Sequence, residues 1–427
     1  MAGVDLDAAG EALMQAMKKN NPQVVWVAQA WQDNPRARMI ENRKAGDMLI
    51  LDLFAESRPQ WGDPQSTWYR KEGFGQHDWA YCMLLNYGGN VGLHGKMQHV
   101  ADEYYKALQS PFGKTLRGVG LTMEGSENNP VMYELLTELP WRPEPFDLAG
   151  WLRKYTEARY GVADPVVQEA WGLLSRSVYN CPAGSVQQGT HESVFCARPA
   201  LDAYQVSSWS EMEDYYDPAD VFRAASLLVS VADRYRGNTN FEYDLTDILR
   251  QALAEKGRLT LKIVAAAYEA SDKALFRAAA DRFLHLIDRQ DELLATRAEF
   301  KVGRWIGQAR ERGTTPEEKN LYEWNARVQI TTWGNRTAAD EGGLRDYAHK
   351  EWSGILKDFY RMRWSAYFDY LQASLEGENP APLDFYALEE PWTKATNVYV
   401  SAPEGETVPT AKRVFGEVFG GNVVPAE

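Results

Sequence analysis

The first third of the chain alternates short apolar runs with segments of helical character. Residues 8–19 have the pattern of a helix. The apolar runs, each typical of a strand, are residues 24–28, 47–53, 79–85 and 118–123. The run at 47–53 is apolar at nearly every position, as expected for a strand buried on both faces. Strands alternating with helices predict parallel βα units.

Four such units make half of an eightfold barrel. We therefore expect residues 1–145 to have an α/β fold, a partial (β/α)8 barrel built from its later strands. An open four-stranded sheet leaves two apolar edges, so we expect the other half of the barrel to lie before Met1. Parallel strands would bring the polar and aromatic residues at their ends to one rim, where barrel enzymes bind substrate.

Closely spaced prolines at 140, 143 and 145 predict a domain boundary, because proline continues neither a helix nor a strand ladder. Residues 148–375 have mainly the pattern of amphipathic helices. One example of helical spacing is Phe276, Ala280, Phe283, Ile287 and Leu294. The tail from 376 on is rich in Pro, Gly and Glu and predicts one last helix near 411–419. We expect residues 146–427 to form a mainly α-helical C-terminal domain without solenoid repeats.

Composition narrows the functional classes. The 427 residues are 44% hydrophobic and 25% charged, which is ordinary for a globular protein. The 15 Trp and 22 Tyr are many; core packing explains most of them, while some could pack against sugar rings. A net charge of −14 argues against nucleic acid as a partner, since nucleic-acid-binding proteins cluster Lys and Arg against phosphates.

Cysteine and histidine spacing predicts no metal site. Cys82, Cys181 and Cys196 include no CxxC pair, and the six histidines form no HExxH motif. Cys181 and Cys196 could form one disulfide, and three unpaired thiols are an equal alternative. No run approaches the roughly 18 apolar residues that span a membrane. The first residues do not have the pattern of a signal peptide, and the compartment stays open.

Glu124 is the most informative residue. It follows the apolar run at 118–123 and precedes a helix-like segment at 131–136, and barrel enzymes place catalytic groups at such strand ends. Asp52 and Glu56 compete for the same role after an earlier strand. Each of these carboxylates could instead bind backbone N–H groups of a loop or pair with an Arg, and composition and spacing leave that choice open.

Several separate motifs carry a resemblance to a known family, because they occur in its order and at similar spacing. They are WVAQAW at 26–31, LDLFAES at 51–57, CMLLNYGGN at 82–90, GLTMEG at 120–125, RSVYNC at 176–181, WG at 333–334 and DYA at 346–348. Together they resemble the α-N-acetylglucosaminidases of glycoside hydrolase family 89. The resemblance runs through nearly the whole chain.

The resemblance implies hydrolysis of terminal, non-reducing α-linked N-acetylglucosamine with retention of configuration, so the expected partner is a glycan with that sugar. It makes Glu124, in a Glu-Gly motif, the nucleophile, with neither metal nor organic cofactor. Retaining enzymes need two carboxyl groups. The family's acid/base lies in an Asn-Glu motif before the helix that matches 8–19, and no such motif precedes that helix here. We therefore expect this chain to hold half of an active site.

The sugar contacts expected are Trp31, Leu53, Asn86, Trp333, Leu344 and Tyr347. By the resemblance, the first is a pocket tryptophan, the second an apolar wall, and the last three close over the sugar. Asn86 is a candidate hydroxyl partner beside the glycines at 88 and 89. Core packing is the alternative for the apolar and aromatic positions.

Two positions depart from the family pattern: Tyr81 stands where relatives often carry Trp, and Leu85 where some carry His. Both departures affect the expected outer shape of the pocket rather than the expected reaction. A rival interpretation is a sugar-binding or assembly module without catalysis, and a third is a helical scaffold with no sugar role. The resemblance suggests a secreted, periplasmic or lysosomal protein, and leaves the natural glycan and the oligomeric state open.

Overall fold

The computed structural model describes residues 3–184, 189–207 and 214–420. The chain packs as two compact units, which we describe separately. The first, here called the sheet unit, comprises Met1–Tyr87, His94–Leu148 and Tyr179–Gly189. The second, here called the helical unit, comprises Gly88–Leu93, Ala149–Val178 and Thr190–Glu427. The short segment Gly88–Leu93, which follows the third strand in sequence, thus packs with the helices.

Four parallel strands form one sheet in the order β1-β2-β3-β4. They are β1 (Trp26–Ala30), β2 (Met48–Asp52), β3 (Asp78–Met83) and β4 (Leu116–Leu121). The predicted parallel βα fold is confirmed, with corrections at the strand ends. β1 begins at Trp26 rather than at 24, and β4 ends at Leu121 rather than at 123. Strand limits follow the pairing of neighbours, and Leu116, outside the predicted run, pairs with Trp79 of β3.

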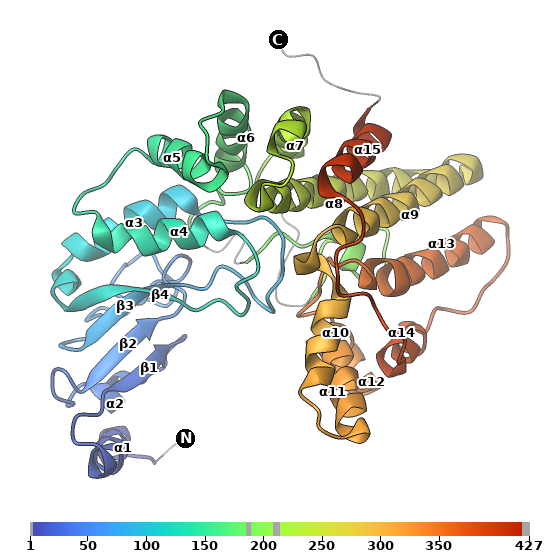
Figure 1. Ribbon diagram of the computed structural model, residues 1–427. Coiled ribbons are helices and arrows are strands. Elements are labelled where there is room, and N and C mark those ends of the chain that lie inside the picture. Colours follow the sequence, from blue (N-terminus) through green and yellow to red (C-terminus); the bar gives the residue numbers. More distant parts are fainter. Residues whose placement is uncertain (1–2, 185–188, 208–213, 421–427) are drawn as a thin grey trace. The chain divides into compact units, whose positions relative to one another are not determined.

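Helices of the sheet unit cover one face of the sheet and one edge (Figure 1). They are α1 (Leu6–Asn20), α2 (Ala37–Ile40), α3 (Met97–Gln109), α4 (Pro130–Glu138) and the short 3-10 turns η1 (Pro111–Thr115) and η2 (Leu139–Trp141). α1 starts at Asp5, whose carboxylate accepts the N–H groups of Asp7 and Ala8. α3 and α4 bury Val100 and Leu135, among others, in the core.

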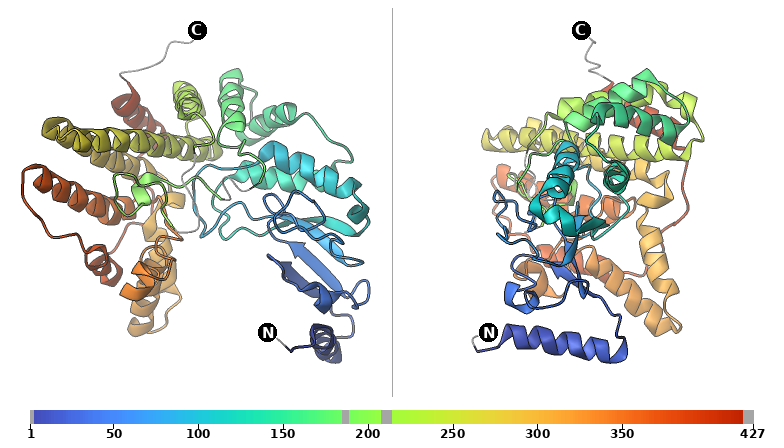
Figure 2. Two further views of the ribbon diagram at one scale, coloured as in Figure 1. Left: turned by 180° about the vertical axis from the view of Figure 1, so that it is seen from behind. Right: turned by 90° about the vertical axis from the view of Figure 1, so that its left-hand side faces the viewer.

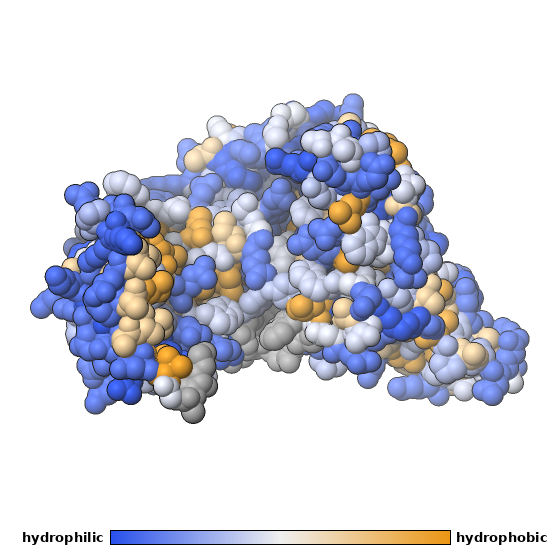
Figure 3. Space-filling model, turned by 90° about the horizontal axis from the view of Figure 1, so that it is seen from below, coloured by the Kyte–Doolittle hydropathy of each residue, from blue (hydrophilic) through white to orange (hydrophobic). Residues whose placement is uncertain are grey.

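Burial differs between the central and outer strands. In β3 every residue after Asp78 is buried, as expected for a parallel strand covered on both faces. The outer strands are less covered: Val27 of β1 is 53% exposed and Leu121 of β4 is 39% exposed. Seen from below, the surface is mostly hydrophilic with scattered apolar patches (Figure 3). Exposed apolar side chains on outer strands are the property expected of half a barrel.

The helical unit consists mainly of α-helices (Figure 2). They are α5 (Leu148–Tyr160), α6 (Pro165–Arg176), α7 (Pro218–Val231), α8 (Thr239–Glu269), α9 (Lys273–Ala295), α10 (Val302–Glu311), α11 (Pro316–Gln329), α12 (Arg336–Asp340), α13 (Arg361–Leu375), α14 (Phe385–Lys394) and α15 (Thr407–Phe419). Short helical turns are η3 (Val194–Cys196), η4 (Ala232–Tyr235), η5 (Ala298–Phe300) and η6 (Leu356–Tyr360). The long helices α8 and α9 lie side by side, and the predicted apolar stripe from Phe276 to Leu294 is buried on α9.

The tail departs from the prediction. The expected last helix is present as α15. The tail also holds a second helix, α14, which its composition did not predict. α14 forms despite an internal proline, Pro391, because Asp384 caps its first turn by accepting the N–H of Ala387 at 3.0 Å. Its Glu389 and Trp392 are buried. Tertiary packing therefore outweighs the poor local helix propensity of this segment.

Candidate active site

The loops that follow the four strands leave the sheet at the same edge, because the strands are parallel. The terminal residues of β1 and β2, Ala30 and Asp52, are paired in register, as are Met83 and Leu121 of β3 and β4. Each loop carries one predicted site residue: Trp31, Leu53, Asn86 and Glu124. The structure therefore brings these four positions to one edge of the sheet.

Hydrogen bonds fasten the Glu124 loop to its neighbours. The Glu124 N–H donates to the Asn86 carbonyl at 3.5 Å, and the Asn86 Nδ2 donates to the Gly125 carbonyl at 2.8 Å. On the other side, Thr122 Oγ1 donates to the carbonyl of Leu53 at 2.7 Å. Glu124 itself is an exposed residue. The backbone that carries this carboxylate is held by the loops after β2 and β3.

Asp52 and Glu56 are buried and bind loop backbone. Asp52 Oδ2 accepts the successive N–H groups of Gln60 and Trp61 at 2.7 and 3.1 Å. Glu56 Oε1 accepts two successive N–H groups just after β3 at 2.9 and 2.8 Å. Burial raises the pKa of each carboxyl to about 7, although these N–H groups act in the opposite direction. Both residues thus have the alternative role that the sequence left open, the binding of backbone N–H groups.

Asn86 is buried, and its amide nitrogen is fully engaged with the protein. Besides the Gly125 carbonyl it lies 3.3 Å from the Tyr133 hydroxyl, which donates to Asn128 Oδ1 at 2.6 Å. Asn86 Oδ1 has no hydrogen-bond partner among the described residues. A buried acceptor without a partner is costly.

Aromatic side chains cluster around Trp31, which is half-buried. Trp31 stacks on Phe54 with centroids 5.9 Å apart and meets Trp68 edge-on at 4.7 Å. Phe54, the residue after Leu53, also contacts Tyr87 at 6.0 Å. Trp68 was not among the predicted positions. Its place in a loop with several aromatic residues was the available signal, but a loop shows no periodicity from which a packing partner can be inferred.

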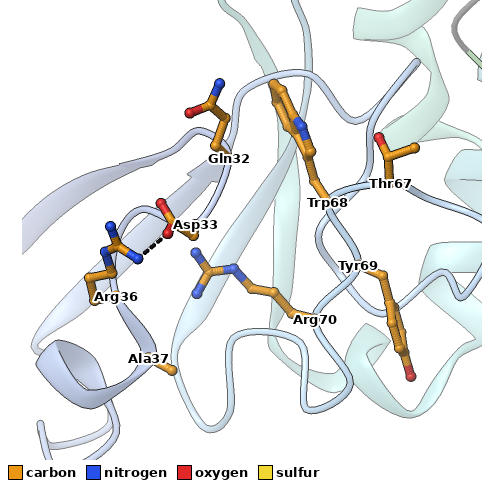
Figure 4. Close-up of a pocket in the computed structure, with 8 residues that line it drawn as sticks. All are labelled: Gln32, Asp33, Arg36, Ala37, Thr67, Trp68, Tyr69 and Arg70. Carbon is orange, nitrogen blue, oxygen red and sulfur yellow. Dashed lines mark hydrogen bonds and ion pairs between the residues drawn. The ribbon is translucent and has the colours of Figure 1, made fainter.

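A pocket of about 610 Å³ opens beside this cluster (Figure 4). It is lined by Gln32, Asp33, Arg36, Ala37, Thr67, Trp68, Tyr69 and Arg70. Arg36 pairs with Asp33 across its rim, as Figure 4 shows. Arg70 is held by Gln60 Oε1 at 2.6 Å and by the Pro35 carbonyl at 2.8 Å. None of the predicted site residues lines this pocket, which shares only Trp68 with the aromatic cluster.

The other three predicted residues lie in the helical unit, close to one another. The rings of Trp333 and Tyr347 are 5.6 Å apart and nearly perpendicular, and the Tyr347 N–H donates to the Leu344 carbonyl at 3.1 Å. Trp333 and Asp346 have left-handed backbones with φ of 61° and 56°. The Asp346 N–H donates to the Thr331 carbonyl at 2.8 Å, so the segments that carry Trp333 and Tyr347 are tied together.

A buried guanidinium anchors this region. Arg363 Nη1 lies 2.9 Å from Asp346 and 3.0 Å from Glu389, and Nη2 donates to the Cys196 carbonyl at 2.7 Å. All three charged side chains are fully buried. Arg198 adds a second guanidinium, 2.6 Å from Glu389. The network fixes Asp346, which lies between Leu344 and Tyr347 in sequence, and it joins segments far apart in the chain.

The glycine loop after β3 packs against Tyr347 within the helical unit. Lys350 Nζ donates to the carbonyls of Gly88 and Gly89, the latter at 2.8 Å. Gly88 has a φ of 60°, and a Cβ placed on it would lie 2.3 Å from the Tyr347 carbonyl oxygen. Only glycine permits both this conformation and this approach.

Cys82, Cys181 and Cys196 are buried and none of them forms a disulfide, so the predicted alternative of three thiols is confirmed. Within the described ranges, no three His, Cys, Asp or Glu side chains gather in a way that could hold a metal ion. In the same ranges, no helix combines the length and apolar character needed to cross a bilayer.

Comparisons with known proteins show the fold and the family to which this architecture belongs. Among solved structures, a family 89 glycoside hydrolase from Clostridium perfringens in complex with 2-acetamido-1,2-dideoxynojirmycin superposes with a TM-score of 0.90 at 30% identity, over 100% of this chain and 48% of that one. A second, in complex with its substrate GlcNAc-alpha-1,4-galactose, has a TM-score of 0.90 and 31% identity over 97% and 47%. The fold is thus that of a TIM-barrel glycoside hydrolase with a helical C-terminal domain.

Residues 1–143 match the family model of the alpha-N-acetylglucosaminidase (NAGLU) TIM-barrel domain, and residues 151–417 that of the NAGLU C-terminal domain. The chain therefore belongs to the alpha-N-acetylglucosaminidase family. Human alpha-N-acetylglucosaminidase is 34% identical over 426 residues, which cover 96% of this chain and 54% of the human protein. The chain spans about half the length of the relatives that it matches.

Proposed function

We propose that this protein removes terminal, non-reducing α-linked N-acetylglucosamine from glycans by a retaining double displacement, with Glu124 as the nucleophile. The observation that carries the proposal is the position of Glu124. It is an exposed carboxylate three residues beyond β4, on a loop that is bonded to the loops after β2 and β3. Family membership supports the reaction type, and the substrate of the second Clostridium perfringens structure supports the sugar.

In the first step Glu124 attacks the anomeric carbon. The C1–O bond breaks, its electron pair goes to the leaving oxygen, and a protonated second carboxyl group donates a proton to that oxygen. In the second step the second carboxyl group, now ionised, takes a proton from water. The water oxygen displaces Glu124 from C1, which restores the configuration. The second carboxyl must lie roughly 5 to 5.5 Å from the first. We assign no residue of this chain to that role.

Sugar contacts in the sheet unit are assigned on local structure as well as on the resemblance. Trp31 would offer an aromatic face, braced by Phe54 and Trp68, to the C–H groups of the sugar. Asn86 would accept a hydrogen bond from a hydroxyl through its unpartnered Oδ1. Leu53, half-buried beside the Glu124 loop, would form an apolar wall.

From the helical unit we propose Trp333, Leu344 and Tyr347 as sugar contacts. The support is their arrangement within that unit, where Trp333 packs edge-on against Tyr347 and the Tyr347 N–H binds the Leu344 carbonyl. Single alanine substitutions at Trp333 and Tyr347 test this directly, because lost contacts raise KM or the dissociation constant of PUGNAc, the ligand in another solved structure of the family 89 glycoside hydrolase from Clostridium perfringens. Unchanged values for both variants would remove these residues from the site.

The nucleophile assignment is tested by Glu124→Gln in this protein, with Glu127→Gln as the matched control. Glu127 is an exposed glutamate of the same loop. With an aryl α-N-acetylglucosaminide, we expect Glu124→Gln to lower kcat by at least about 10³-fold and Glu127→Gln to stay close to the parent. A Glu124→Gln variant with the parental rate contradicts the assignment. A parent that binds PUGNAc and never turns over substrate would instead favour the sugar-binding module.

A further inference from the structure

We infer that Glu56 is a positioning residue for the nucleophile: its carboxylate holds the turn after β3, and that turn holds the Glu124 loop. The inference rests on the proposed function, since it takes Glu124 as the nucleophile. Glu56 makes no contact with the reacting atoms in this account. It acts through the two successive N–H groups of Leu84 and Leu85 and through Asn86.

The first observation is the geometry at Glu56. Its Oε1 accepts the Leu84 N–H at 2.9 Å and the Leu85 N–H at 2.8 Å. Leu85 has a φ of 63°, a left-handed conformation that residues other than glycine rarely adopt. Successive N–H groups in such a turn converge on one point and form a site for an anionic oxygen. Glu56 fills that site from within the protein, so the left-handed turn depends on its carboxylate.

The second observation links this turn to the nucleophile. Asn86 follows Leu85 directly; its carbonyl accepts the Glu124 N–H at 3.5 Å and its side chain donates to the Gly125 carbonyl at 2.8 Å. One residue therefore contacts the Glu124 loop on both sides of the nucleophile. If the turn at Leu84 and Leu85 relaxes, Asn86 moves and the Glu124 loop loses both contacts.

The third observation is that Glu56 is itself held in place. The Ala55 N–H donates to the Cys82 carbonyl of β3 at 3.1 Å, which fixes the segment before Glu56. Ser57, the next residue, accepts a hydrogen bond from the buried Lys96 at 2.8 Å. The Lys96 ammonium also balances the charge of the Glu56 carboxylate. The Glu56 carboxylate is therefore held in a fixed position. The turn that it binds contacts the Glu124 loop through Asn86.

The test compares two variants of Glu56 in this protein. Glu56→Met fills similar space and removes the acceptor. Glu56→Gln keeps an acceptor oxygen at Oε1, and its amide nitrogen takes the place of Oε2, which has no hydrogen-bond partner among the described residues. We expect Glu56→Met to lower kcat by about 10- to 100-fold, because a displacement of order 1 Å at a reacting group costs about that much. KM should change far less, and Glu56→Gln should restore most of kcat.

Asp52→Leu is the matched control. Asp52 is an equally buried carboxylate that also accepts two successive N–H groups, but those of Gln60 and Trp61 rather than those of the turn before Asn86. We expect this variant to lose stability and to keep its kcat. A parental kcat in Glu56→Met, an equal loss in Glu56→Gln, or an equal loss in Asp52→Leu overturns the inference.

Hydrogen exchange separates this inference from the proposed function. In Glu56→Met, peptides that cover residues 83–87 and 122–127 should both exchange faster than in the parent, and in Glu56→Gln both should stay protected. Faster exchange in the first peptide alone would show that the turn does not hold the Glu124 loop, and would overturn the inference. A parent without turnover overturns the nucleophile assignment, and with it the catalytic meaning of Glu56, whatever the exchange pattern.

Discussion

The contact between Gly88 and Tyr347 can be tested by adding one methyl group. In Gly88→Ala the new residue would keep a φ of 60°, which costs an alanine about 1–2 kcal/mol. Its Cβ would lie 2.3 Å from the Tyr347 carbonyl oxygen and 2.7 Å from Ala348 Cα. Ordinary contacts are near 3.5 Å, so the gap must open by about 1 Å, and overpacking of this kind costs about 1–3 kcal/mol. The sum is about 2–5 kcal/mol.

Gly161→Ala provides the control for the backbone term. Gly161 follows α5 in the same unit with a φ of 83°, and a Cβ there would meet nothing within 4 Å. Calorimetry should show a transition for Gly88→Ala several degrees below that of Gly161→Ala, at roughly 2–4 °C per kcal/mol. PUGNAc should bind Gly88→Ala at least about tenfold more weakly than the parent, because Tyr347 is displaced, and bind Gly161→Ala like the parent. Equal transitions and equal affinities for the two variants would refute the reasoning.

Two further predictions concern substitutions of buried charged residues. Arg363→Met removes the buried guanidinium that Asp346 and Glu389 share, leaves Glu389 paired only with Arg198, and should cost about 3–5 kcal/mol in denaturant unfolding. Arg336→Met removes exposed pairs with Asp384 and Asp340 and a contact with the Tyr386 ring, and should cost about 1 kcal/mol or less; equal losses would contradict the network. Burial raises the pKa of Glu56 from 4.5 to about 7, so its contribution to stability is full below pH 4.5 and is lost as the pH rises through 7. Relative to the parent, Glu56→Gln should therefore gain stability from pH 5 to pH 8, and a course parallel to the parent would count against the raised pKa.

Local pattern sufficed to locate the four strands of the sheet. The run at 47–53 contains β2 because a strand buried in a parallel sheet needs apolar residues on both faces. The limits of β1 and β4 escaped prediction, since strand ends are set by pairing with neighbours, as between Leu116 and Trp79. α14 escaped because its stability comes from Glu389 and Trp392 in the core rather than from its composition.

The candidate site was only partly predictable. Glu124 could be singled out because a carboxylate after a strand of a parallel sheet lies at the functional edge, and the resemblance supplied its role. The partners of Glu56 could not be predicted, because the sequence does not show which backbone N–H groups a carboxylate binds. The same holds for the approach of Gly88 to Tyr347, which joins residues far apart in the chain. Contacts of this kind depend on the completed fold.

The most direct measurement is the covalent trapping of the protein with a slow fluorinated α-N-acetylglucosaminide, followed by mapping of the labelled peptide. A retaining mechanism accumulates a glycosyl ester on its nucleophile when the second step is slowed. The account predicts an adduct on Glu124 and none on Glu127. A label on any other residue would contradict the central claim.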